Sequence, residues 1–146
     1  MSPWVLDTDC FSLFQQGHPL VTQRVNAVAF EELATTFITV EEQMYGRLNR
    51  IRRANSREAL VLAYANLRDT MEDFKTINML DFNQDAYTCY AELMRQRIRI
   101  GTQDLRIAAI VISQNGILVT RNQRDFSRVP DLRFEDWTID ESDLGR

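Results

Sequence analysis

The chain opens on an apolar run that ends in acidic residues, Trp4-Val5-Leu6-Asp7-Thr8-Asp9. A short apolar run bounded by polar residues is typical of a buried strand that reaches the edge of a sheet. No long helix is evident beside Asp7, and a buried carboxylate without a partner is costly. Asp7 therefore indicates a functional group at the end of the first strand.

Three further segments place acids beside apolar runs in the same way. Phe37-Ile-Thr-Val40 leads into Glu41 and Glu42, Asp104 opens an apolar helical stretch, and Ile117-Leu-Val-Thr120 leads into a second polar pair. If the runs are neighbouring parallel strands, their carboxyl ends meet at one edge of the sheet. Clustered carboxylates repel each other unless a cation lies between them. The sequence therefore predicts an all-oxygen Mg²⁺ or Mn²⁺ site formed by Asp7, Glu42, Asp104 and Asp125, with Asn122 as a weaker carbonyl donor.

Each of the later acids also has a purely structural interpretation. Thr39 and Glu42 have the spacing of a capping box, in which Glu42 would only satisfy backbone donors. Asp104 follows Thr102 in a first helical turn, where an acid is favoured by the helix dipole. Asn122 and Asp125 have the spacing of another helix cap. The metal-site hypothesis depends on the joint pattern of the four acids rather than on any one of them.

Strand-like and helical segments alternate along the whole chain. Strands are expected at residues 4–7, 37–40, 77–82, 117–120 and 133–137. Helices are expected at residues 9–15, 20–28, 41–54, 85–97 and 102–113. A further helix, with Ser56 as its expected cap, ends near Phe74. This alternation predicts an α/β fold, a single domain over residues 1–146 with a central, mainly parallel sheet flanked by helices.

Apolar residues recur at helical spacing on two neighbouring helices. One stripe, expected to be core or interface, contains Leu60, Ala63, Tyr64, Leu67, Met71 and Phe74. Met44, Leu48 and Ile51 form a second face on the preceding helix. Together the two faces offer more apolar area than one small sheet is expected to cover, which favours a groove for an amphipathic partner helix.

Composition narrows the class of protein. The 146 residues are 45% hydrophobic and 26% charged, as in an ordinary globular domain. No apolar run approaches the roughly 18 residues of a membrane helix, and the start has no export signal, so a cytoplasmic protein without a membrane contact is expected. Cys10, Cys89 and His18 are too few and too scattered for a disulfide framework or a structural zinc site.

The basic residues are almost all arginines, and several of them lie close together in the sequence. The net charge is −4, yet 16 of the 17 cationic residues are arginine, whose planar fork fits phosphate oxygens. Five arginines lie close together and are expected either to contact RNA or an acidic partner or to form a solvated helix face: Arg47, Arg50, Arg52, Arg53 and Arg57.

Four motifs of this chain resemble those of PIN-domain proteins of the VapC toxin type. They are Val5-Leu-Asp-Thr-Asp9, Ile38-Thr-Val-Glu-Glu-Gln-Met-Tyr-Gly46, Ile100-Gly-Thr-Gln-Asp-Leu-Arg-Ile-Ala-Ala109 and Leu118-Val-Thr-Arg-Asn-Gln-Arg-Asp-Phe-Ser-Arg-Val-Pro-Asp-Leu132. Their order and spacing cover nearly the whole chain. The second motif, in which a Glu precedes Tyr-Gly, selects Glu42 over Glu41. Many relatives carry Asp where this chain has Asn122, which makes Asp125 the fourth acid, and relatives often have Gly where this chain has Asp131.

The resemblance implies a PIN-like three-layer α/β sandwich and a metal-dependent endoribonuclease. Its substrate would be structured RNA such as tRNA or rRNA, its cofactor Mg²⁺ or Mn²⁺, and its physiological state a homodimer silenced by a cognate antitoxin protein. These are expectations that the structure and the comparisons with known proteins test below.

Three rival interpretations use the same residues. Asp7 and Asp9 after an apolar strand also resemble the start of a haloacid-dehalogenase phosphatase, in which Asp7 would be the nucleophile and Asp9 a general acid. That family and the response-regulator receivers both need a later lysine, and the only one here is Lys75. The third interpretation is a non-catalytic interaction module in which the acids are helix caps. No glycine-rich loop precedes Lys75, so a nucleotide-binding P-loop is excluded.

Overall fold

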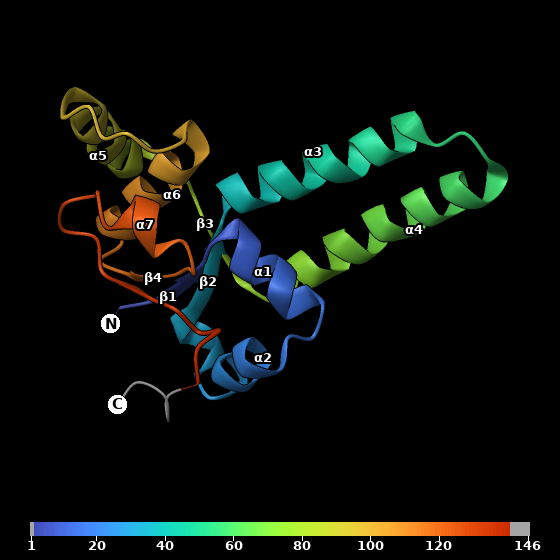
Figure 1. Ribbon diagram of the computed structural model, residues 1–146, viewed down its shortest axis with the longest axis horizontal. Helices are drawn as coiled ribbons and strands as arrows, with labels where there is room; N and C mark the ends of the chain where they lie inside the picture. Colours follow the sequence, from blue (N-terminus) through green and yellow to red (C-terminus); the bar gives the residue numbers. More distant parts are fainter. Residues whose placement is uncertain (1, 141–146) are drawn as a thin grey trace.

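The computed structural model describes residues 2–140 and shows a five-stranded sheet with helices on both faces (Figure 1). The strands are β1 (Trp4–Leu6), β2 (Leu33–Thr36), β3 (Asn78–Leu80), β4 (Ile117–Val119) and β5 (Phe134–Glu135). Their order is β3-β2-β1-β4-β5, and every neighbouring pair is parallel. The predicted α/β class and parallel sheet are confirmed.

Successive residues of each strand enter opposite faces of the sheet, which produces two cores. Val5 pairs with Ala34 and Leu118, and all three belong to the core on one face. The neighbouring Leu6 and Val119 belong to the core on the other face. This two-residue period, in strands apolar on both faces, gives the three-layer architecture.

Different helices cover the two faces. The core that contains Val5 is completed by α5 (Gln84–Arg95), α6 (Thr102–Ser113) and the short α7 (Gln123–Phe126). The core that contains Leu6 is completed by α1 (Thr8–Gln15), α2 (Pro19–Asn26) and the end of α4 (Arg57–Phe74). A 3-10 turn, η1 (Phe30–Glu32), precedes β2. Pro19 stands at the first position of α2, as its fixed φ favours.

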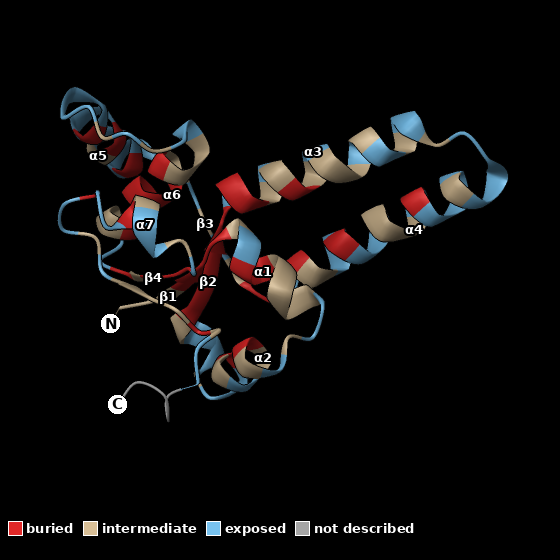
Figure 2. Ribbon diagram, viewed as in Figure 1, coloured by how far each residue is buried: buried red, intermediate tan, exposed pale blue. Residues whose placement is uncertain are grey.

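Two long helices form a hairpin that projects from the sheet. They are α3 (Phe37–Arg53) and α4, and Ser56 caps α4 through a hydrogen bond from the Ala59 amide, as the sequence predicts. Figure 1 shows the hairpin extending to the side of the molecule, and Figure 2 shows the buried residues of α3 toward the sheet and those of α4 spread along the helix. The hairpin residues that belong to the two cores, Ile38 and Phe74, lie at its base. Only the base of the hairpin therefore contributes to the sheet's packing.

The predicted strand at residues 37–40 is wrong. The strand β2 lies earlier and ends at Thr36, whose hydroxyl accepts a hydrogen bond from the Thr39 amide and caps α3. The β-branched residues Ile38, Thr39 and Val40 thus lie in the first turn of a helix, because the cap and tertiary packing outweigh their weak strand propensity. A capping box between Thr39 and Glu42 is not formed, since the cap is Thr36.

The apolar stripe of α4 is only partly core. Ala63 and Phe74 are buried, but Leu60, Tyr64 and Met71 are exposed. Lys75 is the C-cap of this helix. Asp131 has a φ of 66°, in the left-handed region that favours glycine, which agrees with its place where relatives often have Gly. Among helices of residues 2–140, none is long and apolar enough to cross a membrane.

Candidate metal centre

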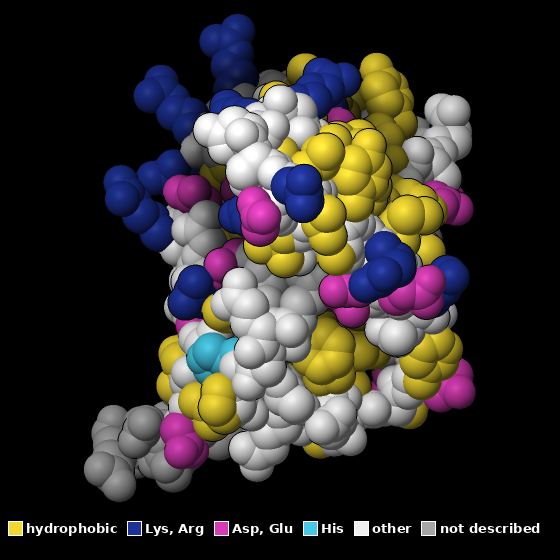
Figure 3. Space-filling view, turned by 90° about the vertical axis from the view of Figure 1, so that its right-hand side faces the viewer, with side chains coloured by type: hydrophobic (Ala, Val, Ile, Leu, Met, Phe, Trp, Pro, Cys, Tyr) yellow, Lys and Arg dark blue, Asp and Glu magenta, His cyan; other side chains and the backbone are white. Residues whose placement is uncertain are grey.

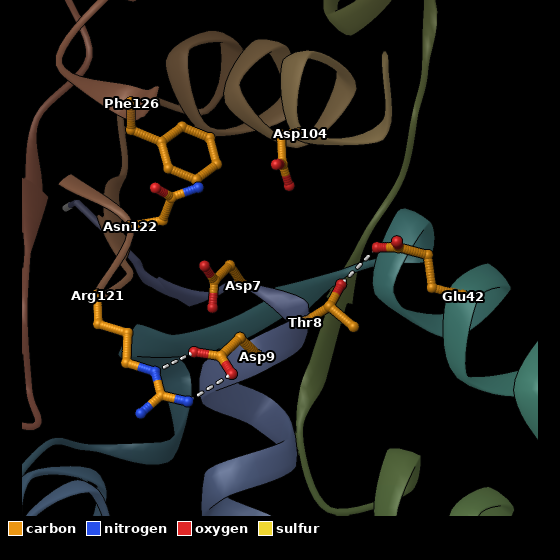
Figure 4. Close-up of a pocket in the computed structure, with 8 residues that line it drawn as sticks. All are labelled: Asp7, Thr8, Asp9, Glu42, Asp104, Arg121, Asn122 and Phe126. Carbon is orange, nitrogen blue, oxygen red and sulfur yellow. Dashed lines mark hydrogen bonds and ion pairs between the residues drawn. The ribbon is translucent and has the colours of Figure 1, made fainter. Parts of the chain in front are cut away.

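A pocket of about 660 Å³ opens at the carboxyl ends of β1 and β4, beside the first turns of α3 and α6. Figure 4 shows the carboxyl groups of Asp7 and Asp104 directed toward one space, with the amide of Asn122 beside them. Eight residues line the pocket: Asp7, Thr8, Asp9, Glu42, Asp104, Arg121, Asn122 and Phe126. The structure therefore brings four of the five residues of the predicted metal site together.

Asp7 joins the sheet to the first helix. Its Oδ1 accepts a 2.8 Å hydrogen bond from the Cys10 amide, and its own amide donates to the Val119 carbonyl on β4. A helix does begin beside Asp7, so the carboxylate also serves as the cap of α1. Burial raises the pKa of Asp7, and hydrogen bonds from Thr120 and Cys10 offset only part of that rise. The site therefore holds a buried carboxylate whose negative charge its hydrogen-bond donors stabilise only in part.

Asp104 lies in the first turn of α6, whose N-cap is Gly101 without a side-chain cap bond. Partial burial and then the negative charges of Asp7, Glu42 and Asp125 raise the pKa of Asp104 to about 6. An acid that only served the helix dipole would have its pKa lowered. Burial is the larger cause of this rise in the pKa of Asp104, and the negative charges of the neighbouring carboxylates add to it.

Glu42 lies in the second turn of α3 and faces α1. Its Oε1 accepts a 2.6 Å hydrogen bond from the Thr8 hydroxyl, so α1 fixes the direction of the Glu42 carboxylate (Figure 4). The neighbouring Glu41 points elsewhere, and its Oε1 accepts a hydrogen bond from Gln103 on α6. This geometry agrees with the choice of Glu42 over Glu41 for the pocket.

Asn122 and Asp125 have different positions. Asn122 lines the pocket and caps α7, accepting a hydrogen bond from the Asp125 amide. The Asn122 side-chain amide donates to Asp125 Oδ2 at 3.0 Å, and Asp125 also lies 3.8 Å from Arg128. Asp125 is thus behind Asn122, outside the pocket lining, and its role as fourth acid stays a prediction.

Four lining residues were not predicted for the site from the sequence, namely Thr8, Asp9, Arg121 and Phe126. Arg121 donates two hydrogen bonds to Asp9, at 2.6 and 3.0 Å. The signal for Thr8 and Asp9 was their place directly after Asp7 in the first motif. No sequence pattern predicted a role for Arg121, because its pairing with Asp9 depends on how close β4 lies to β1.

The donor set fits a hard divalent cation. Carboxylate oxygens of Asp7, Glu42 and Asp104 and the amide oxygen of Asn122 are the ligands that Mg²⁺ and Mn²⁺ prefer. The Cys10 sulfur also lies within 4.8 Å of oxygens of Asp7 and Asp9. Burial holds the pKa of the Cys10 thiol far above its usual range, so the sulfur stays protonated and is a poor ligand.

The structure places the five arginines of residues 47–57 along the hairpin, away from the pocket. Arg47 donates to Thr70 on α4, and Arg50 and Arg53 line a separate depression between α3 and α4. Lys75 binds Glu72 at 3.0 Å and does not line the acidic pocket, where a phosphatase of the haloacid-dehalogenase type would need it.

Comparisons with known proteins agree with this fold. The PIN domain family matches residues 4–132. Ribonuclease VapC2 of Haemophilus influenzae is 32% identical over 138 residues, which cover 94% of this chain and 99% of that protein. The tRNA(fMet)-specific endonuclease VapC of Shigella flexneri is 30% identical over 143 residues, covering 94% of this chain and 100% of the relative.

Solved structures give the same result. The DNA-bound VapBC of Salmonella typhimurium contains a chain that superimposes with a TM-score of 0.76 at 27% identity, covering 94% of this chain and 99% of that one. A chain of VapBC-1 from nontypeable Haemophilus influenzae gives a TM-score of 0.75 at 26% identity, with 93% and 98% covered. The family match and these superpositions identify the all-parallel three-layer sandwich, with its acidic pocket at the carboxyl edge, as a PIN-domain fold. The chain belongs to the PIN domain family and, within it, to the VapC type.

Proposed function

We propose that this protein is a divalent-metal-dependent endoribonuclease that cuts structured RNA and is the toxin of a toxin–antitoxin pair. The observation that carries the proposal is the pair Asp7 and Asp104, two partly or fully buried carboxylates whose pKa values are both raised in one pocket. The names of the relatives, ribonuclease and tRNA(fMet)-specific endonuclease, support RNA and, more specifically, tRNA as the substrate.

Residues of four segments would hold the ion. Asp7, Glu42 and Asp104 supply charged oxygens, Asn122 supplies a neutral one, and Asp125 adds a charge from behind Asn122. A bound Mg²⁺ or Mn²⁺ lowers the pKa of a water molecule and orients a phosphate for in-line attack. Thr8 keeps Glu42 directed at the pocket, and Asp7 is kept rigid by its place between β1 and α1.

Cleavage of structured RNA by the purified protein tests the proposal directly. We expect cleavage with Mn²⁺ or Mg²⁺ and none with EDTA. Asp104→Asn should lower the rate by more than about 100-fold, because loss of a ligand costs more than loss of a residue that supports one. Asp69→Asn is the matched control, since Asp69 is an exposed acid on α4 that pairs with Arg68. A rate that EDTA leaves unchanged would overturn the mechanism.

We further propose a homodimer and a cognate antitoxin. The hairpin exposes large apolar side chains on both of its helices, including Tyr45, Leu48, Val61 and Tyr64. Figure 3 views the molecule from the hairpin side and shows these apolar surfaces beside arginines. The antitoxin's amphipathic segment would lie against this face and approach the acidic pocket. A toxin–antitoxin pair that cuts RNA would act in the cytoplasm.

The partner proposal has its own test. Light scattering at high concentration should give the mass of a dimer, and a neighbouring small protein expressed with this chain should co-purify and block cleavage. Tyr64→Asp should weaken that association while the isolated protein stays folded, because Tyr64 is 56% exposed. A strict monomer contradicts the dimer, and failure of any neighbouring protein to inhibit contradicts the antitoxin.

A further inference from the structure

The acidic pocket has a cation at its mouth, and a carboxylate holds that cation in place. Arg121 Nε donates to Asp9 Oδ2 at 2.6 Å and Arg121 Nη2 to Asp9 Oδ1 at 3.0 Å (Figure 4). Within the described residues that line the pocket, Arg121 is the only cationic side chain beside four acidic ones. The pair connects the first turn of α1 with the segment after β4, which are the segments that carry Asp7 and Asn122.

The pair is too exposed to be a strong structural bond. The side chains of Arg121 and Asp9 are 50% and 47% exposed. An ion pair so exposed contributes little to stability, because solvent screens it. Exchange of Asp9 for another anion of similar shape therefore costs little.

The guanidinium has the geometry that such an anion needs. Two parallel N–H donors that fit a carboxylate also fit two oxygens of a phosphodiester. A nucleic-acid backbone that approaches four clustered acids is repelled unless cations lie beside them, and Arg121 is the cation that the protein itself supplies there. Two arginines of neighbouring segments are engaged elsewhere: Arg106 lies over the Tyr90 ring, and Arg128 donates to the Arg99 carbonyl.

We propose that Arg121 binds a backbone phosphate of the RNA substrate and that Asp9 is its positioning residue. Asp9 holds the guanidinium at the mouth of the pocket until a phosphate takes the place of the carboxylate. This inference rests on the proposed ribonuclease function and adds to it the group that recognises the substrate backbone beside the acids.

Binding without cleavage tests the inference. A short fluorescein-labelled RNA stem–loop is titrated with the full-length protein in EDTA over a series of salt concentrations, and anisotropy reports binding. Arg121→Ala should weaken binding about tenfold, as expected for loss of a charge-assisted contact. It should also reduce the slope of log affinity against log salt by about 1, because one phosphate contact is lost. Arg121→Lys keeps the charge but not the forked pair of donors, so its RNA affinity should lie between those of wild type and Arg121→Ala.

Substitution of Asp9 should have the opposite effect on RNA affinity. Asp9→Asn frees the guanidinium from its competitor and should strengthen RNA binding, and this gain should disappear in the Asp9→Asn/Arg121→Ala double variant. Arg95→Ala is the matched control, since Arg95 makes a similar two-bond pair with Glu92 on exposed α5. It should leave affinity and salt slope unchanged.

Three results would overturn the inference. The first is an Arg121→Ala variant with the RNA affinity and salt slope of wild type. The second is weaker RNA binding in both Arg121→Ala and Asp9→Asn, which indicates that the pair is merely structural. The third is a gain in RNA affinity from Asp9→Asn that persists in the double variant without Arg121. Any of these in a protein that still cuts RNA with Mn²⁺ refutes only the role of Arg121. Absence of cleavage by the wild-type protein refutes the proposed function instead.

Discussion

The Thr8 hydroxyl donates a 2.6 Å hydrogen bond to Glu42 Oε1 and lies 3.0 Å from the hydroxyl of Thr39. Thr8 has one proton and gives it to Glu42, so Thr39 is the donor in the second bond. The result is a chain of two hydroxyls that runs from the buried start of α3 through α1 to a carboxylate of the pocket. A residue of the first motif thereby sets the orientation of a residue of the second.

Loss of the Thr8 hydroxyl should release Glu42. Thr8→Val keeps the shape of the side chain but removes the donor, so we expect metal affinity and cleavage to fall roughly 10–100-fold, as for other residues that orient a ligand. Thr8→Ser keeps the donor and should stay near wild type. Mn²⁺ titration by calorimetry measures the effect independently of cleavage, and equal affinities in the two variants would exclude this role for Thr8.

The raised pKa of Asp104 predicts a stability that depends on pH in the metal-free protein. The folded pKa of about 6 is above that of the unfolded chain, so the favourable contribution of the protonated group is complete below about pH 4. It is lost as pH rises through 6. In EDTA, Asp104→Asn should therefore match wild type near pH 4 and melt at higher temperature at pH 8, by roughly 2–4 °C after allowance for solvent screening.

Bound metal should reverse the order of the melting temperatures of wild type and Asp104→Asn at pH 8. Because Mn²⁺ binds the ionised acids of the folded protein, it should raise the melting temperature of wild type more than that of Asp104→Asn at pH 8. Below about pH 6 the proton on Asp104 competes with the metal, and the difference should shrink. A variant that is less stable than wild type in EDTA at pH 8 would show that Asp104 serves the fold rather than the metal.

Asp125 should act largely through Asn122. The hydrogen bond between the Asn122 amide and Asp125 Oδ2 orients the residue that lines the pocket. We expect Asp125→Asn to weaken Mn²⁺ binding and cleavage roughly 10–100-fold. The same change in an Asn122→Ala background should have a much smaller effect, because the two residues share one interaction. Fully additive losses would instead make Asp125 an independent ligand.

The arginines of the hairpin form a separate prediction. Arg52 and Arg53 are exposed near the end of α3. If this region contacts RNA, their joint replacement by Ala should reduce the salt slope of RNA binding by about 1–2, and the effect should add to that of Arg121→Ala because the sites are far apart. An unchanged slope assigns both residues to the solvated surface or to the antitoxin face, which inhibition by the antitoxin then distinguishes.

Local signals in the sequence already determined most of the elements. Alternating apolar runs and helical stripes predicted the parallel sheet and the helix α6 with its observed bounds, Thr102–Ser113. The cap of α4 at Ser56 was equally visible, since caps depend only on neighbouring residues. The start of α3 was not, because the β-branched residues after Thr36 favour a strand locally and only packing and the Thr36 cap decide for a helix.

The residues proposed for the metal site divide in the same way. Asp7 and Asp104 were found from sequence because Asp7 ends an apolar strand and Asp104 opens an apolar helix. Glu42 was found through the second motif, although the strand expected before it is the start of α3. Only tertiary structure decided that Asn122 rather than Asp125 lines the pocket and that Asp9 pairs with Arg121. The physical reason is that side-chain direction and charge pairing depend on distances between segments that are far apart in the chain, which no local pattern encodes.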